Sequence, residues 1–227
     1  MRRGAGRALA GAVLAGLVLA GCSSSAADGK GGGTPSPSDG TAKDGTARDG
    51  TAKNGDRGTG RPAAKGITLG GAGSACVLPV TFDLAKDWKP QAVEVEPGSD
   101  LAELGEQGTV TLVCEIDAKP AGNIGYLRVW AGGKSAGDAR SALEAFVADE
   151  PHAAKAVYTE AEAGSVAAVE VGYTVDGDPS DGPKPERAFA VATPEGPLVV
   201  HLGGMDAEEH RQMLPAYELA RESLKLG

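Results

Sequence analysis

The alternation of apolar and polar positions along residues 77–226 predicts short strands interrupted by two helices. The segments rich in alternating apolar and β-branched residues, where strands are expected, are 77–84, 92–96, 109–116, 124–131, 156–161, 165–175, 186–192 and 197–202. Trp88-Lys89-Pro90 predicts a turn between the first two strands, and the acidic Gly/Pro-rich stretch 176–183 predicts a hairpin loop.

The two helices are expected over 138–149 and after Asp206, where the apolar spacing changes to that of a helix face. Asp138 is placed to N-cap the first helix, and Pro151 to end it. The buried face of the first helix is expected to hold Ala139, Ala142, Leu143, Phe146 and Val147. The order of strands and helices is that of an α+β protein, an antiparallel β-sheet packed by helices.

The second helix begins with Asp206 and Glu209, which have the spacing of an Asp-x-x-Glu capping box. Its buried face is expected to hold Met213, Tyr217, Ala220 and Leu224. Pro215 lies inside this helix and predicts a kink or a restart there, because proline lacks the N–H that a helix interior uses.

The N-terminus carries an export signal. Arg2, Arg3 and Arg7 precede an apolar run over 8–21, which fits a signal peptide and is short for a spanning helix of roughly 20 residues. The run ends in Leu19-Ala20-Gly21-Cys22, which resembles the lipobox of bacterial lipoproteins. The resemblance implies a signal peptide over 1–21, a lipid on Cys22, and anchoring at the extracytoplasmic face of the cell membrane. The alternative is an uncleaved helical anchor.

Residues 22–66 are expected to form the lipidated cysteine and a disordered tether. They are rich in Gly, Thr, Asp and Lys, and a five-residue repeat, Asp-Gly-Thr-Ala-Lys/Arg, runs through 39–53. A segment with so few apolar residues cannot offset its ordering entropy by burial. Residues 67–227 are then a single α+β domain.

The charge of residues 67–227 limits the class of partner. They contain 12 Lys/Arg and 26 Asp/Glu, a net charge of −14. Nucleic acids are excluded as partners, because phosphate binding draws on clustered cations. The membrane is reached through the lipid on Cys22 rather than through this domain.

Cys76 and Cys114 are the cysteines that remain beside Cys22. In an exported protein such a pair predicts a disulfide, which would contribute about 4 kcal/mol in the chain-entropy model. Two free buried thiols or a metal pair are the alternatives. A zinc site needs further ligands at close spacing, and neither cysteine has a neighbouring His or Cys.

No catalytic, metal or cofactor site is predicted. Gly132-Gly133-Lys134-Ser135 lacks the first glycine of a phosphate loop, and the acidic stretch 176–181 lacks the spacing of a calcium loop. Of the histidines, His201 is expected on the strand face opposite Val200, and His210 on the solvent-facing side of its helix. No Gly-x-Ser-x-Gly motif accompanies them.

The element order resembles the Mog1/PsbP-like fold of LpqN-type actinobacterial lipoproteins. The segments that carry the resemblance are Phe82-Asp83-Leu84-Ala85-Lys86-Asp87-Trp88, Arg187-Ala188-Phe189-Ala190-Val191-Ala192-Thr193, Leu198-Val199-Val200-His201-Leu202 and Ala220-Arg221-Glu222-Ser223-Leu224. The resemblance implies an αβα sandwich and a non-enzymatic binding or accessory module. It transfers no functional residue.

Three functions follow, in order. The first is a module that binds a protein partner in the cell envelope. The second is a lipid or small-molecule carrier, which requires an apolar pocket of at least about 300 Å³. Such a pocket would lie between the sheet and the C-terminal helix, with Trp130 and Tyr217 as lining. The third is a hydrolase, which requires Ser, His and Asp to converge.

Overall fold

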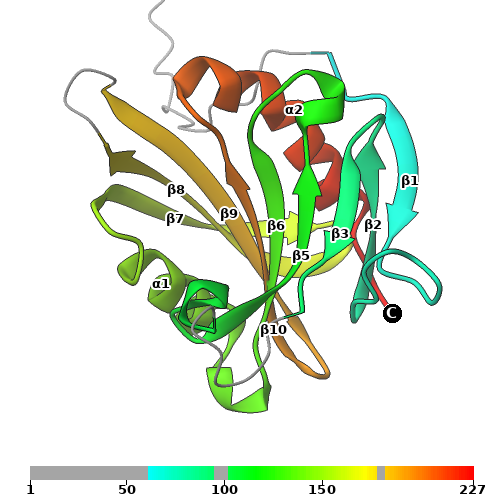
Figure 1. Cartoon of the computed structure of the whole chain (residues 1–227). Coiled ribbons are helices and arrows are strands. Elements are labelled where there is room, and N and C mark those ends of the chain that lie inside the picture. Colours follow the sequence, from blue (N-terminus) through cyan, green and yellow to red (C-terminus); the bar gives the residue numbers. More distant parts are fainter. Residues whose placement is uncertain (1–60, 95–101, 178–181) are drawn as a thin grey trace, which may run out of the picture. The chain divides into compact units, whose positions relative to one another are not determined.

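The computed structural model describes residues 61–94, 102–177 and 182–227. Within these residues the main sheet is antiparallel, with the strand order β3-β5-β6-β10-β9-β8-β7 and β4 paired to β5 (Figure 1). Its strands are β3 (Lys89–Ala92), β4 (Glu106–Gln107), β5 (Val110–Asp117), β6 (Tyr126–Ala131), β7 (Ala153–Ala163), β8 (Val166–Asp176), β9 (Pro183–Thr193) and β10 (Gly196–Gly203).

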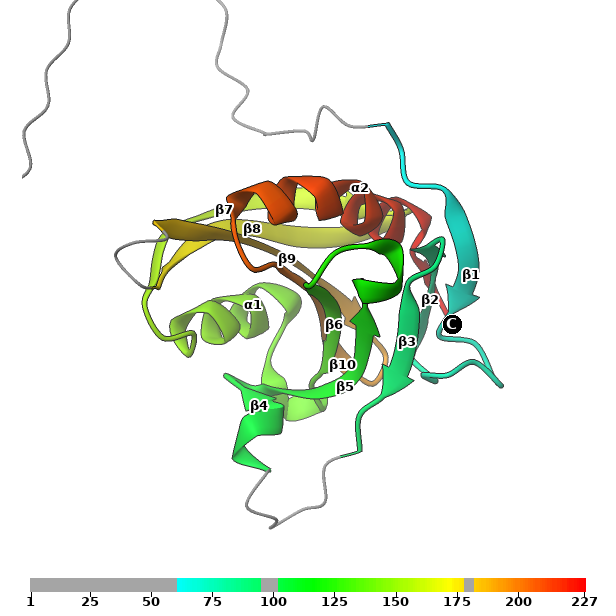
Figure 2. The same ribbon diagram turned by 45° about the horizontal axis from the view of Figure 1, so that its top comes forward.

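The two helices cover opposite faces of this sheet, α1 (Ala139–Ala148) on one and α2 (Ala207–Ser223) on the other (Figure 2). Alternate residues of one strand divide between two cores. On β10, Val199 packs in the core under α1, whereas Val200 packs in the core under α2. The predicted α+β architecture, a sheet between helices, is confirmed.

A small second sheet lies beside α2, with the strand order β1-β2-β11. Its strands are β1 (Lys65–Leu69), β2 (Val80–Ala85) and β11 (Lys225–Leu226). The chain between β1 and β2 is joined to β5 by the disulfide Cys76–Cys114, whose cysteines are both buried in the α2-side core. Lys65 and Gly66 of β1 belong to the segment that the sequence assigns to the tether.

Both helices begin as the sequence predicts. The Asp138 carboxylate accepts a hydrogen bond from the Ser141 N–H, and Asp206 accepts one from the Glu209 N–H. The capping box is only half formed, because the Glu209 carboxylate binds the N–H groups of Ile124 and Met205 instead of that of Asp206. Helix α2 continues through its Pro215 to Ser223.

The predicted turn at Trp88-Lys89-Pro90 is wrong. Lys89 and Pro90 belong to β3, and the reversal occurs one residue earlier, at Asp87, whose φ is +70°. Pro90 is tolerated because β3 is an edge strand of the described sheet, where a missing N–H breaks no second ladder. The expected strand over 92–96 is not found at residues 93–94, and its last two residues lie outside the described part.

Candidate functional site

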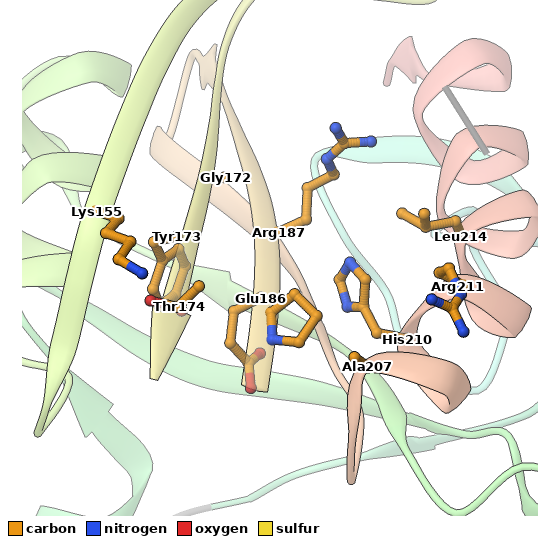
Figure 3. Close-up of a pocket in the computed structure, with 11 residues that line it drawn as sticks. Lys155, Gly172, Tyr173, Thr174, Glu186, Arg187, Ala207, His210, Arg211 and Leu214 are labelled. Atoms are coloured by element: carbon orange, nitrogen blue, oxygen red, sulfur yellow. The ribbon is translucent and has the colours of Figure 1, made fainter. Parts of the chain in front are cut away.

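A pocket of about 370 Å³ opens where the first turns of α2 pass over the ends of β8 and β9 (Figure 3). Its lining comes from β7, β8, β9 and α2, namely Lys155, Gly172, Tyr173, Thr174, Pro185, Glu186, Arg187, Ala207, His210, Arg211 and Leu214. Because segments far apart in the sequence contribute, the pocket could not be recognised as a local motif.

Strand register explains how the floor of the pocket forms. Gly172 pairs with Arg187 and Thr174 pairs with Pro185, so these residues lie on one face of the sheet. Further along the same face, the Tyr217 ring of α2 packs against the β9 core, 5.6 Å from the Phe189 ring. A Cβ atom at Gly172 would meet no atom within 4 Å. The pocket is therefore the space that α2 leaves over this glycine.

A buried polar cluster lies beside the pocket on the α1 face of the sheet. The Nε2 atom of His201 is 2.7 Å from Glu186 Oε2 and 3.2 Å from the Tyr173 hydroxyl. Lys184 Nζ is 2.7 Å from the other oxygen of Glu186. Glu186 and His201 are only 4% and 6% exposed. Four polar side chains from three strands thus share one site.

Burial and charge oppose each other at Glu186. Burial alone raises the pKa of this carboxyl, but the hydrogen bonds and charges of His201 and Lys184 outweigh it, so the pKa lies below the ordinary value. The carboxylate is then ionised at neutral pH and only accepts, so the His201 Nε2–H donates to it. The pKa of Tyr173 is raised, mainly by burial and then by Glu186, and its phenol keeps its proton.

This cluster lacks the nucleophile of a hydrolase. Within the described part of the chain, the hydrogen-bonding partners of His201 are Glu186 and Tyr173, with no serine or threonine hydroxyl among them. His201 Nδ1 is buried without a hydrogen-bond partner there, next to the Phe146 ring at 5.4 Å. Cys76 and Cys114 are joined to each other and cannot serve as thiols. The three groups that a Ser-His-Asp triad needs do not converge here.

Tyr217 does not line the pocket but locks α2 to the sheet. It is fully buried, and its hydroxyl donates to Glu170 Oε1 of β8 at 2.8 Å. Arg187 of β9 and Arg221 of α2 both hydrogen-bond to Glu218, at 3.4 and 2.7 Å. The interface expected to hold an apolar ligand is closed at this point by packing and by ion pairs.

Trp130 lies on the other face of the sheet. It packs against Phe146 of α1 with the ring centroids 5.4 Å apart, and it is 5% exposed. The structure therefore does not bring Trp130 and Tyr217 together. Residues 124–131 and 213–224 show which positions are apolar, but not which face of the sheet each helix covers.

The histidines divide between the two faces. His201 lies opposite Val200 and Leu202, as alternation predicts. The prediction that His210 faces solvent is wrong, because it is 6% exposed and lines the pocket. Its spacing to Met213 and Leu214 is the i, i+3, i+4 pattern of a buried helix stripe, which was the available signal. Lys155, Gly172, Tyr173 and Glu186 had no such signal.

Two large apolar side chains are presented together at the surface. Ile124 is 59% exposed and Met205 is 64% exposed. The Glu209 carboxylate accepts the Ile124 N–H with one oxygen and the Met205 N–H with the other, the latter at 2.6 Å. One side chain of α2 thus fixes two loops that are distant in sequence. We call Ile124, Met205 and the Glu209 that joins them the apolar patch.

Two further features concern anchoring and metals. No helix in the described part of the chain combines the length and apolar character that crossing a membrane requires. Nowhere in 61–94, 102–177 or 182–227 do three or more His, Cys, Asp or Glu side chains gather closely enough to hold a metal ion. Cys22 lies outside the described residues.

Comparisons with known proteins place the chain in a broader setting. Residues 46–224 match the model of a protein family described as uncharacterised lipoprotein. Among solved structures, the chain is similar to cyanobacterial PsbP (CyanoP) from Synechocystis sp. PCC 6803, with 12% identity and a TM-score of 0.44. That match covers 70% of this chain and 97% of the other. None of the curated proteins matches the chain.

Proposed function

Because the chain belongs to this family of uncharacterised lipoproteins, we propose that it is a non-catalytic accessory module of the cell envelope that binds a protein partner. The lipid on Cys22 holds it at the extracytoplasmic face of the membrane, and the polar segment 22–66 sets the domain away from the bilayer. The order of elements, which resembles that of LpqN-type actinobacterial lipoproteins, supports the same role.

The apolar patch is the observation that carries this proposal. Ile124 and Met205 are each more than half exposed, so each leaves apolar surface in water that a partner could bury. Their backbones are already fixed by Glu209, and binding therefore costs little ordering of the loops.

Close packing next to the patch supports the same argument. A Cβ atom at Gly125 would lie 2.3 Å from the Met213 side chain and 2.4 Å from the Gly203 carbonyl oxygen. The chain that carries Ile124 is thus held directly against β10 and α2. A rigid apolar anchor of this kind is typical of the centre of a protein interface.

The charges around the patch indicate the chemistry of the partner. Asp206 and Glu208 are exposed in the first turn of α2, and the folded segment is strongly acidic. We expect the partner to present an apolar centre with a basic rim, because complementary charge speeds association and disfavours wrong partners.

The alternative functions receive less support. An apolar carrier needs an open space between the sheet and α2, where Tyr217 and Met213 are fully buried. A hydrolase needs a nucleophile next to His201, and the described residues supply a phenol and a carboxylate there.

The experiment is cross-linking of the full-length lipidated chain in its own membranes, followed by identification of the linked proteins. A photo-reactive amino acid replaces Ile124 in one chain and Leu104 in another. Leu104 is 76% exposed and lies in the segment next to β4, away from α2, so it is a matched control.

One protein linked from position 124 and not from position 104 is the expected result. Loss of that product in Met205→Asp, with an unchanged unfolding midpoint, would place the contact at the apolar patch. Equal labelling of many proteins from both positions would reject a specific partner.

A further inference from the structure

We propose that the pocket between β7, β8, β9 and the first turns of α2 binds a small soluble organic anion, a phosphate ester or a carboxylate. This inference does not depend on the partner-binding function. It rests on which side chains meet in the pocket, on the backbone of β7 at its entrance, and on the charge of the remaining surface.

Basic side chains gather here in an otherwise acidic segment. Residues 67–227 have 12 Lys/Arg against 26 Asp/Glu, yet Lys155, Arg187 and Arg211 line this single pocket together with His210. The carboxylate in the lining is Glu186, whose two oxygens are held by Lys184 and His201. A cationic hollow in an anionic surface concentrates field lines and attracts anions.

Lys155 is the cation that is available to a ligand. Arg187 is bonded to Glu218 and Arg211 to Glu208, whereas Lys155 forms no ion pair with any residue that the structure describes. Figure 3 shows its side chain extending from β7 toward Tyr173, within the outline of the pocket.

The backbone of β7 is distorted at this lysine. The pairing of β7 with β8 shifts register between Ala154 and Val157, and Lys155 has φ of +56°. Non-glycine residues adopt this conformation at a cost of roughly 1–2 kcal/mol, and such strain is found where a side chain is redirected for binding. His152, just before β7, also has a positive φ, of +64°.

The size and lining of the pocket define the ligand further. A volume of about 370 Å³ holds a small molecule and excludes a lipid tail. Leu214, Ala207 and Pro185 add apolar surface beside the cations, so an anion with a short carbon body fits better than a bare ion. The net negative charge of the segment repels an anionic bilayer, which favours a soluble ligand over a headgroup.

Isothermal titration of the full mature chain with glycerol 3-phosphate tests the proposal. Glycerol serves as the uncharged probe and inorganic phosphate as the bare anion. We expect saturable binding of glycerol 3-phosphate, weaker binding of phosphate and none of glycerol. The affinity should fall with added salt, as for any charge-dependent contact.

Two variants locate the site. Gly172→Val adds a side chain into open space on a strand, so it should fill the pocket and abolish binding while the fold is retained. Lys155→Gln should weaken binding by about tenfold, the value of one charge-assisted hydrogen bond. Lys134→Gln removes an equal charge at an exposed position outside the lining and should change nothing.

Three outcomes would overturn the proposal. The first is the absence of saturable binding of the organic anion. The second is unchanged affinity in both Gly172→Val and Lys155→Gln. The third is stronger retention of the chain, lacking its own lipid through Cys22→Ser, on phosphatidylglycerol vesicles than on phosphatidylcholine vesicles. That retention would have to be lost in Gly172→Val, and it would assign the pocket to a lipid headgroup.

Discussion

At the residue scale, the Glu186–His201–Tyr173 cluster is the most unusual feature of the sheet. Ionisable side chains are buried only at a cost, and here the cost is offset by direct hydrogen bonds among them. Glu186 is the centre of this arrangement, since it binds His201 through one oxygen and Lys184 through the other. Its charge therefore couples the stability of the fold to pH.

Glu186→Gln should destabilise the protein at pH 7 by about 1–3 kcal/mol, because the amide keeps one acceptor but loses the charge. The pKa of Glu186 is lowered in the folded state from the ordinary 4.5. Its stabilisation is thus present above that value and is lost as the pH falls through the lower folded-state pKa. Urea unfolding from pH 7 down to pH 3 should show the gap between variant and wild type closing below about pH 4.5.

Glu195→Gln is the matched control, because it makes the same chemical change on the exposed turn between β9 and β10. Its unfolding should follow the wild type within about 0.5 kcal/mol at each pH. If both variants gave the same pH dependence, the coupling assigned to Glu186 would be refuted.

At the element scale, the turn between β7 and β8 supports the C-terminal end of α2. Gly164 has φ of +58°, and its N–H donates to the Arg221 carbonyl at 2.8 Å. A Cβ atom there would lie 1.9 Å from the Leu224 carbonyl oxygen. The close approach of backbone to backbone leaves no room for a side chain.

Gly164→Ala should therefore lower the free energy of unfolding by more than the roughly 1–2 kcal/mol that the left-handed conformation alone costs. Thermal and urea unfolding measure it. Gly172→Ala is the control, because its Cβ meets nothing within 4 Å, and it should leave stability within about 1 kcal/mol of wild type. Equal effects of the two alanines would show that α2 moves freely away from the turn.

At the scale of the whole molecule, the disulfide joins the chain after β1 to the interior strand β5. The cysteines are 38 residues apart, and their Cα atoms are 6.0 Å apart. The bond thus closes a loop that contains β2 and β3, as well as the segment 95–101 outside the described residues. Its main contribution is to the entropy of the unfolded chain.

Replacing Cys76 and Cys114 together by serine should lower the free energy of unfolding by about 4 kcal/mol. Urea unfolding with and without reductant measures this: reductant should destabilise the wild type and leave the double variant unchanged. A wild type indifferent to reductant, with free thiols detected after unfolding, would contradict the bond.

The anchor can be tested separately from the fold. A lipobox cysteine is expected to carry two or more acyl chains, and two chains suffice for stable anchoring where one gives only marginal binding. Cys22→Ser should move the protein from the membrane fraction to the soluble fraction with unchanged unfolding. Retention of Cys22→Ser in membranes after a high-salt wash would favour an uncleaved helical anchor.

The sequence by itself determined the elements and their order. The alternation over 109–116 and 165–175 predicted β5 and β8 to within about a residue, since the side-chain period of a strand is a local property. Asp138 and Asp206 marked the helix starts for the same reason, because an N-cap bonds within its own first turn. The cysteine pair followed from composition and the export signal.

Only the tertiary structure decided which of these elements meet. Glu186 and His201 are 15 residues apart, Tyr173 and His201 are 28 apart, and Ile124 and Glu209 are 85 apart. Their contacts depend on strand order, on the register between strands and on which face each helix covers. None of these leaves a periodic signal in the chain. The pocket over Gly172 and the apolar patch exist because α2 crosses β8 and β9 where it does.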